Sequence, residues 1–290
     1  MAIDPDIIKK ISDAVKLKPR TVQEISEIIK KNWRTAERYV DKISEETGDI
    51  STRVFRKGTR GALKIVYWSS IESIHSTSFQ EGIFRKIMSR MRKAEFSPFD
   101  IYQFVPDRYK KAFVEDLSKL NTEKEVSQEQ DLVGSLRQAS KQVYIFAGNL
   151  SFINLKQNGI RILDVLRELV KRNISIKVVS RVSLIGVENV KILLALNKAA
   201  GKELVEIRHR YQPLRGIMVD KKLIKMSETR YPEYYRKGEL KKKIGVFYDI
   251  YDPEWLEWMQ KVFWRMFSIG IPAERRIREI EKIKKQILIS

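Results

Sequence analysis

The sequence predicts an α/β protein that carries a small α+β unit at its N-terminal end. Residues 1–70 contain three amphipathic helical periods followed by two alternating segments of β type. Residues 136–270 instead alternate between apolar strand-like runs and helical periods. Residues 71–135 are expected to form a helical connector, and residues 271–290 a basic C-terminal helix. A chain of 290 residues is long enough for two domains, each with its own core.

The N-terminal segment contains start and stop signals for three helices. Asp4 is expected to cap the first helix, with Pro5 at its first position. Thr21 is expected to cap the second, and Glu24 completes a capping box. The third helix follows the turn "KKNW" and ends at Gly48. The expected buried faces are Ile7, Ile8, Ile11 and Val15, then Val22, Ile25, Ile28 and Ile29, then Ala36, Val40 and Ile43.

The next segment predicts a β-hairpin. Ile50–Arg56 and Ala62–Trp68 alternate in polarity and flank "KGTRG", which supplies glycines for the turn. Three helices followed by a hairpin with a basic tip is the order of a winged helix-turn-helix. The segment from about residue 5 to 70 resembles that DNA-binding superfamily, because spacing, caps and hairpin all agree.

This resemblance implies that the third helix enters the major groove of DNA. The residues expected to contact DNA from the helix are Asn32, Trp33, Arg34, Thr35, Arg38 and Lys42. Arginine can pair with guanine and asparagine with adenine, and Lys42 is expected at a phosphate. At the hairpin tip, the expected contacts are Lys57, Thr59 and Arg60. A protein-binding domain with solvated basic residues is the alternative.

The charge of the chain also points to a polyanion. Lys and Arg number 57 against 37 Asp and Glu, which gives a formal net charge of +20 at pH 7. Such an excess attracts nucleic acid first and anionic membrane second. A heat-adapted surface is the alternative, but its ion-pair networks need both signs of charge and do not explain the surplus. We therefore expect double-stranded DNA as the partner.

Several classes of site are disfavoured by composition. The absence of cysteine excludes disulfides, thiolate metal sites and cysteine nucleophiles. Two histidines leave little for a histidine-based metal site. No apolar run reaches the roughly 18 residues of a membrane span, and the first residues lack the order of a signal peptide. We expect a soluble, cytoplasmic, nucleoid-associated protein without cofactor, metal or membrane contact.

The connector is predicted to contain two amphipathic helices, at residues 79–96 and 106–120. They are expected either to build a dimer interface or to pack as ordinary core. The strands predicted after the connector lie at residues 141–149, 174–182, 204–211, 215–228 and 243–252, and the helices at 161–173, 189–202 and 253–267. The strands are rich in β-branched residues and are expected to be buried on both faces.

The stretch "QPLRGIMVD", Gln212 to Asp220, carries a second resemblance. With the strand "VYIFAGN", the helix ending "LVKRNISIKVV" and a last helix rich in aromatic residues, it resembles a half-unit of the phospholipase D superfamily over residues 136–268. That superfamily has a nucleophilic His and a phosphate-binding Lys two residues apart on one strand. Here Pro213 stands at the His position and Arg215 at the Lys position. His209 has the wrong spacing to substitute.

The second resemblance therefore implies a phospholipase D-like α/β domain that is degenerate and not an enzyme. Together the two domains resemble the archaeal TrmB family of transcriptional regulators. This implies a DNA-binding regulator or chromatin-like protein. A phosphodiesterase or nuclease, and a non-catalytic module that assembles other proteins on nucleic acid, are the alternatives.

A homodimer and an effector pocket are further expectations. Active members of the superfamily pair two half-units, and this chain has one, so a second copy is expected to supply the other. Arg215, Asp220 and Glu228 mark a candidate pocket for a small anionic effector, unless Arg215 simply pairs with one of the two carboxylates. The C-terminal helix places Ile277, Ile280, Ile283 and Ile287 on one side. It is expected to dock on its own domain, on a partner subunit or on DNA.

Overall fold

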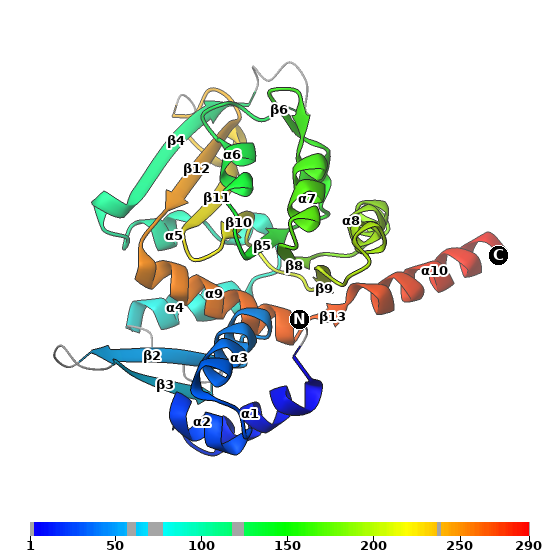
Figure 1. The fold of residues 1–290 in the computed structure, drawn as a ribbon. Coiled ribbons are helices and arrows are strands. Elements are labelled where there is room, and N and C mark those ends of the chain that lie inside the picture. The colour runs from blue at the N-terminus through cyan, green and yellow to red at the C-terminus, as the bar shows by residue number, and fades with distance from the viewer. Residues whose placement is uncertain (1–2, 57–61, 69–77, 118–124, 237–238, 290) are drawn as a thin grey trace. The chain divides into compact units, whose positions relative to one another are not determined.

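The chain forms two compact units, unit 1 (Met1–Thr77) and unit 2 (Ser78–Ser290). The computed structural model describes residues 3–56, 62–68, 78–117, 125–236 and 239–289 (Figure 1). Each unit has its own hydrophobic core.

Unit 1 contains three helices and a three-stranded antiparallel sheet in the strand order β1-β3-β2. Its elements are α1 (Pro5–Leu17), β1 (Arg20–Thr21), α2 (Val22–Ile28), α3 (Trp33–Glu46), β2 (Ile50–Arg56) and β3 (Ala62–Trp68). The hairpin strands have the predicted bounds. The two-residue strand β1, which pairs with β3, was not predicted, because so short a strand has no periodicity to detect.

The predicted helix caps of unit 1 are present. The Asp6 N–H donates to the Asp4 carboxylate, and Thr21 and Glu24 form a reciprocal capping box. The helix α3 begins at Trp33, because Asn32 caps it. The Thr35 N–H, which has no partner within the helix, donates to the Asn32 side-chain oxygen at 2.8 Å.

The buried face of α2 differs from the prediction at one position. Val22, Ile25 and Ile29 are buried, but Ile28 is 38% exposed and Ser26 is buried instead. At about 100° of rotation per residue, Ser26 lies nearer than Ile28 to the mean direction of the other three. Its hydroxyl donates to the carbonyl of Gln23, which satisfies the buried polar group.

Unit 2 is built on an eight-stranded mixed sheet with the strand order β13-β9-β8-β5-β10-β11-β12-β4. Among the described strands of this sheet, the neighbouring pairs β5–β8 and β8–β9 are parallel, and the other neighbouring pairs are antiparallel. The strands are β4 (Lys110–Asp116), β5 (Gln142–Ala147), β8 (Ser175–Ser180), β9 (Val205–His209), β10 (Gly216–Val219), β11 (Leu223–Arg230), β12 (Ile244–Ile250) and β13 (Ile271–Pro272), and β6 (Lys156–Gln157) and β7 (Ile160–Arg161) form a separate pair.

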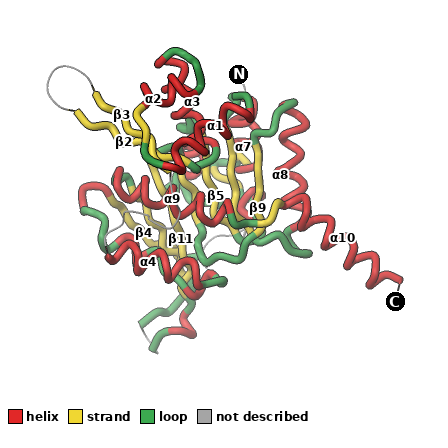
Figure 2. Tube along the Cα trace, turned by 90° about the horizontal axis from the view of Figure 1, so that it is seen from below, coloured by secondary structure: helices red, strands yellow, loops and turns green. Residues whose placement is uncertain are grey.

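Helices cover both faces of this sheet (Figures 1 and 2). They are α4 (Ser78–Ser89), α5 (Phe99–Tyr102), α6 (Leu132–Arg137), α7 (Ile162–Lys171), α8 (Val187–Ala200), α9 (Pro253–Ser268) and α10 (Ala273–Ile289), with single turns η1 (Lys93–Glu95), η2 (Asp107–Tyr109), η3 (Ser151–Asn154) and η4 (Pro232–Tyr234). Alternate residues of β5 separate the faces. Ile145 joins the core shared with α6, α7 and α8, whereas Tyr144 and Phe146 contact Phe263 of α9.

One predicted connector helix is wrong. Residues 106–120 were expected to form a helix, but Lys110–Asp116 is the edge strand β4, which pairs with β12 along its whole length. Phe113 and Phe247 stack across this pair with ring centroids 5.2 Å apart. The gain from pairing with a strand far away in the sequence outweighs the local helical pattern. The other predicted connector helix is present as α4, and it ends earlier, at Ser89.

The first half of α10 packs on its own unit. Ala273, Ile277 and Ile280 belong to the core shared with α7 and α8, and Lys191 of α8 lies 2.9 Å from Glu281. Ile283, which the sequence places on the same side of the helix, is 46% exposed, and the side chain of Ile287 lies outside the described residues. Within the described part of the chain, no helix combines the length and apolar character needed to cross a bilayer.

Candidate functional site

The outward side of α3 carries exposed basic residues. Arg34 and Arg38 are exposed and Trp33 is 46% exposed, whereas Ala36 and Val40 on the opposite side are fully buried. Because Arg34 and Arg38 are four residues apart, they lie on one stripe of the helix. Within the described residues, neither guanidinium has an ion-pair partner. We call Trp33, Arg34 and Arg38 the α3 outer face.

Two carboxylates in the middle of α3, Glu37 and Asp41, point elsewhere. Lys64 Nζ on β3 lies 2.6 Å from Asp41 Oδ1 and 3.4 Å from Glu37 Oε1. These ion pairs hold both carboxylates on the side of the helix that faces β3. The α3 outer face therefore keeps its positive charge.

The other residues predicted to contact DNA have different positions. Asn32 uses its side-chain oxygen to cap α3, so that oxygen is not available to accept the adenine N–H of a paired Asn–adenine contact. Thr35 and Lys42 are half-buried. Lys57, Thr59 and Arg60 of the hairpin tip lie outside the described residues.

In unit 2, the position of Pro213 before β10 offers no nucleophile. Pro213 is buried and has no reactive side-chain atom, and its neighbour Gln212 is engaged with the backbone. The Gln212 amide donates to the carbonyl of Ala147 at 3.0 Å and accepts from the N–H of Leu214 at 2.6 Å. These bonds fix the loop against the end of β5. They give it a structural role.

Arg215 is a half-buried cation at the start of β10. Its guanidinium donates to the carbonyls of Leu214 and Gln212, and within the described residues it has no carboxylate partner. A Cβ placed at Gly148 would lie 2.9 Å from Arg215 Nη2, so a side chain there would displace the guanidinium from this position. Burial, together with the charge of Arg181, lowers the pKa of Arg215 to about 10.

Asp220 does not join Arg215, which corrects the predicted anion pocket. Its carboxylate accepts from the N–H groups of Ser140, Lys141 and Gln142 at 2.9 Å each and from the Ser140 hydroxyl at 2.7 Å. Burial alone would raise the pKa of Asp220, but these hydrogen bonds outweigh it and hold the pKa below its ordinary value. Asp220 therefore stabilises the turn that leads into β5.

Glu228 is also engaged in its own contacts. It lies 2.8 Å from Arg230 Nη2 and accepts a hydrogen bond from the Tyr248 hydroxyl at 2.6 Å. Burial and this hydrogen bond raise the pKa of Tyr248. Neither Glu228 nor Asp220 lines the cavity that contains Arg215. Of the three residues predicted to form an anion pocket, only Arg215 lines this cavity.

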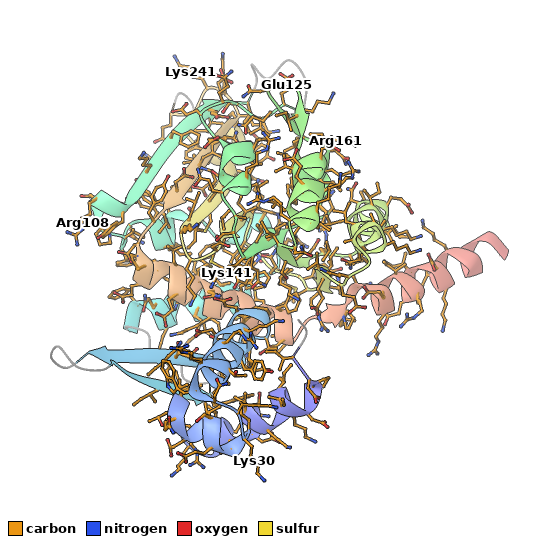
Figure 3. The ribbon with its side chains drawn as sticks, viewed as in Figure 1. Lys30, Arg108, Glu125, Lys141, Arg161 and Lys241 are labelled. Carbon is orange, nitrogen blue, oxygen red and sulfur yellow. The ribbon has the colours of Figure 1, made fainter. Side chains whose placement is uncertain are left out.

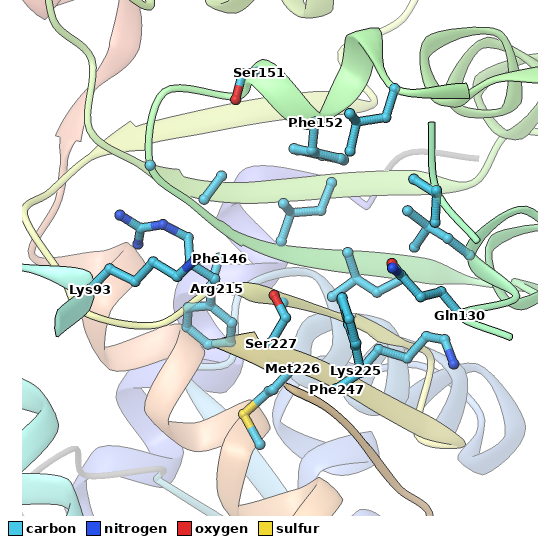
Figure 4. Close-up of a pocket in the computed structure, with 18 of the residues that line it drawn as sticks. Lys93, Gln130, Phe146, Ser151, Phe152, Arg215, Lys225, Met226, Ser227 and Phe247 are labelled. Carbon is cyan, nitrogen blue, oxygen red and sulfur yellow. The ribbon is translucent and has the colours of Figure 1, made fainter. Parts of the chain in front are cut away.

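A cavity of about 510 Å³ lies in unit 2 at the carboxyl end of β5 (Figure 4). At this place, β8 runs parallel to β5 on one side and β10 runs antiparallel to β5 on the other. The cavity extends over β10, β11, β12 and β4 on the face that α6 and α7 share. Its size lies within the range of small-molecule sites.

Three of the cations that line this cavity lie near one another. They are Lys93 of η1, Arg181 after β8, and Arg215. Burial and the nearby charges of Arg215 and Lys243 lower the pKa of Lys93, partly offset by Glu228. Neither Lys93 nor Arg181 was predicted from the sequence. Lys93 lies in a segment without a motif. Arg181 follows a parallel strand, and the position after such a strand is a signal that could have found it.

Within the described residues, no group of three or more His, Asp or Glu side chains is placed to hold a metal ion. The arrangement in unit 2 can bind an anion through its three cations. It provides no residue at Pro213 that could attack a phosphorus atom.

The fold, the α3 outer face and the cavity together define a mixed α/β protein. Unit 1 is small and carries exposed basic residues, and unit 2 contains a cavity lined by cations. No family model matches the chain, and no curated protein matches it in sequence. Among solved structures it is similar to Nuc, a phospholipase D family member from Salmonella typhimurium, with 12% identity and a TM-score of 0.39, over 56% of this chain and 97% of Nuc.

Two further solved structures are similar at the same level. TrmBL2, an archaeal chromatin protein described as showing a novel mode of DNA binding, is 12% identical with a TM-score of 0.38, over 92% of this chain and 93% of its own. NucT from Helicobacter pylori is 10% identical with a TM-score of 0.35, over 56% of this chain and 99% of NucT. At these values, the functional interpretation rests on the residues of this chain.

Proposed function

We propose that this protein binds double-stranded DNA through unit 1, acting as a winged helix in which α3 is the recognition helix. The observation that carries the proposal is the α3 outer face. It presents two exposed guanidinium groups that have no ion-pair partner among the described residues, and an exposed indole at the start of a capped helix. Arginines so placed can reach guanine edges in a major groove.

The order of elements in unit 1 supports this proposal. Two helices joined by a short turn, α2 and α3, are followed by the β2–β3 hairpin. Lys30 in that turn has a positive φ of 52°, and the Lys31 N–H bonds back to Ser26 at 3.0 Å, which ends α2 sharply. This turn therefore fixes the angle between α2 and α3. The α3 outer face points away from the core of unit 1.

We propose further that unit 2 is not catalytic. The phospholipase D reaction needs a nucleophilic side chain at the position that Pro213 occupies, and proline has none. Incubation with labelled single- and double-stranded nucleic acid and with a chromogenic phosphodiester, with and without chelator, tests this. Turnover that is lost in Arg215→Ala would contradict the proposal.

The experiment that tests DNA binding compares two double variants that each remove two positive charges. Arg34→Ala/Arg38→Ala alters the α3 outer face, and Lys9→Ala/Lys10→Ala alters exposed residues of α1. Binding of a labelled duplex is measured by fluorescence anisotropy at fixed salt. We expect the α3 variant to lose about 2 to 6 kcal/mol on a preferred site, at about 1 to 3 kcal/mol for each arginine. The α1 variant should lose far less.

An equal loss in the two double variants would show that only total charge matters, and would contradict the recognition role of α3. Genomic occupancy then separates the two forms of the proposal. Binding at a few promoters indicates a regulator, whereas broad coverage indicates a chromatin-like protein.

A further inference from the structure

The cavity of unit 2 contains charge that the protein itself does not neutralise. Lys93, Arg181 and Arg215 gather at one end, and within the described residues none has a carboxylate within ion-pair distance. Lys93 donates to the Thr229 hydroxyl at 2.7 Å, and Arg215 donates to two carbonyls. Neutral acceptors satisfy hydrogen bonds and leave the net charge in place. Arg181 is exposed, but Lys93 and Arg215 are half-buried. Half-buried cations that repel one another destabilise the folded unit unless an anion joins them.

The rest of the cavity is mostly apolar. Phe113 and Phe247 form part of the floor, and Val126, Leu132 and Leu155 form part of the wall. Figure 4 shows Lys93 and Arg215 at one end of the lining, and Lys225 with Gln130 at the other. Lys225 is paired with Asp249 at 2.6 Å, so the cation at that end is already neutralised. The cavity therefore has one cationic end and an apolar body.

We infer that this cavity binds a small amphipathic anion, with a carboxylate, phosphate or sulfonate head at Arg215, Lys93 and Arg181 and an apolar body against Phe113, Phe247 and Leu132. The volume of about 510 Å³ accommodates a molecule of the size of a medium-chain fatty acid or an aryl phosphate. A free inorganic anion would leave the apolar walls uncovered. The inference concerns unit 2 alone and does not depend on DNA binding by unit 1.

Titration of the full chain with 8-anilinonaphthalene-1-sulfonate, a fluorescent aromatic sulfonate, tests this inference in the absence of DNA. We expect saturable binding of one molecule per chain. Decanoate and phenyl phosphate should displace the dye, while inorganic phosphate at the same concentration should not. Displacement by inorganic phosphate as effective as that by decanoate would contradict the amphipathic class.

Two variants test the two ends of the cavity separately. Arg215→Gln removes one head contact and should weaken dye binding about tenfold, as expected for a hydrogen bond between charged groups. Ser227→Phe adds bulk from the floor of the cavity at a half-buried serine of β11, and should also weaken binding while every cation remains. Lys198→Gln, at an exposed position on α8, removes the same charge and should bind like the wild type.

Each variant is first shown to be folded by its thermal unfolding transition. Arg34→Ala/Arg38→Ala, which alters unit 1 only, should bind the dye like the wild type. Dye binding and DNA binding are therefore tested independently of each other. Unaltered dye binding in both folded Arg215→Gln and Ser227→Phe would overturn the inference. If one of these two does not fold, the other decides, together with the displacement experiment.

Discussion

The Asp220 carboxylate accepts four hydrogen bonds from one turn, three from N–H groups and one from a hydroxyl. It is 8% exposed, so these bonds are largely shielded from water. In Asp220→Asn, one carboxylate oxygen becomes an amide nitrogen that faces N–H donors. We expect the free energy of unfolding to fall by about 2 kcal/mol in urea titrations. Asn154→Asp, a reverse exchange of the same two groups in η3, serves as a control and should change stability less.

Asp220 also predicts how stability depends on acid. Its folded pKa lies below the ordinary value of 3.8, so the unfolded chain takes up the proton first as the pH falls. The stabilisation by Asp220 is therefore fully present above the unfolded pKa and is lost as the pH falls through the folded pKa. The difference in unfolding free energy between wild type and Asp220→Asn should shrink from pH 6 to about pH 2. A difference that grows with acid would contradict the assignment.

His209 gives a second pH dependence, in a higher range. Its ring nitrogen Nδ1 accepts from the Val182 N–H at 2.9 Å, and burial and Arg276 lower its pKa below 6.5, partly offset by Glu279. Below pH 6.5 the unfolded state binds a proton that the folded state does not, so stability should rise with pH from the folded pKa up to about 6.5. His209→Gln should flatten this part of the curve, measured as urea midpoints between pH 5 and 8.

At the scale of elements, α3 depends on its cap. Asn32→Ala removes the side-chain acceptor for the Thr35 N–H and should cost about 1 kcal/mol of stability. Asn32→Ser keeps a capping oxygen and removes the amide, so it should retain both stability and DNA affinity. A folded Asn32→Ser with wild-type stability but weak DNA binding would show that the amide contacts a base after all. Thermal unfolding and anisotropy on the same samples separate the two roles.

Local signals made several elements predictable. The capping box of Thr21 and the strands β2 and β3 follow from residues within a few positions of one another, and the structure has them as predicted. The strand β4 follows from its distant partner β12, which no local pattern reveals. The cavity needs Lys93, Arg181 and Arg215 together, and only the folded sheet brings them to one end. Arg215 could be predicted because it occupies the Lys position of a known strand motif, whereas Lys93 and Arg181 belong to no motif.

At the scale of the whole molecule, most of the positive charge belongs to unit 2. Residues 1–77 hold 15 Lys and Arg against 11 Asp and Glu, whereas residues 78–290 hold 42 against 26. Arg108 and Lys241, labelled in Figure 3, are exposed examples on unit 2. We therefore expect unit 2 to add sequence-independent phosphate contacts. The slope of log binding constant against log salt should be steeper for the full chain than for residues 1–77. Equal slopes would confine DNA contact to unit 1.

The oligomeric state is the second prediction at this scale. We expect a dimer formed through unit 2, since a two-fold arrangement would present two α3 helices to a pseudo-palindromic site. Sedimentation should be performed on residues 78–290, because β4 belongs to the sheet of unit 2 and a fragment that begins after it lacks an edge strand. A fragment that is folded and monomeric at micromolar concentration would contradict this prediction.

The pairing of β4 with β12 also affects the order in which the chain folds during synthesis. In the large sheet, β4 is synthesised first, and β5, β8, β9, β10 and β11 all follow before its partner β12 is made. β4 therefore has no partner until nearly all of unit 2 has been made, while unit 1, whose contacts are local, can fold early. Lys110, Lys111, Glu115 and Asp116 place charges at both ends of β4, and charged edge strands resist pairing with other chains. The charges on β4 therefore disfavour aggregation of the nascent chain during the interval between the synthesis of β4 and that of β12.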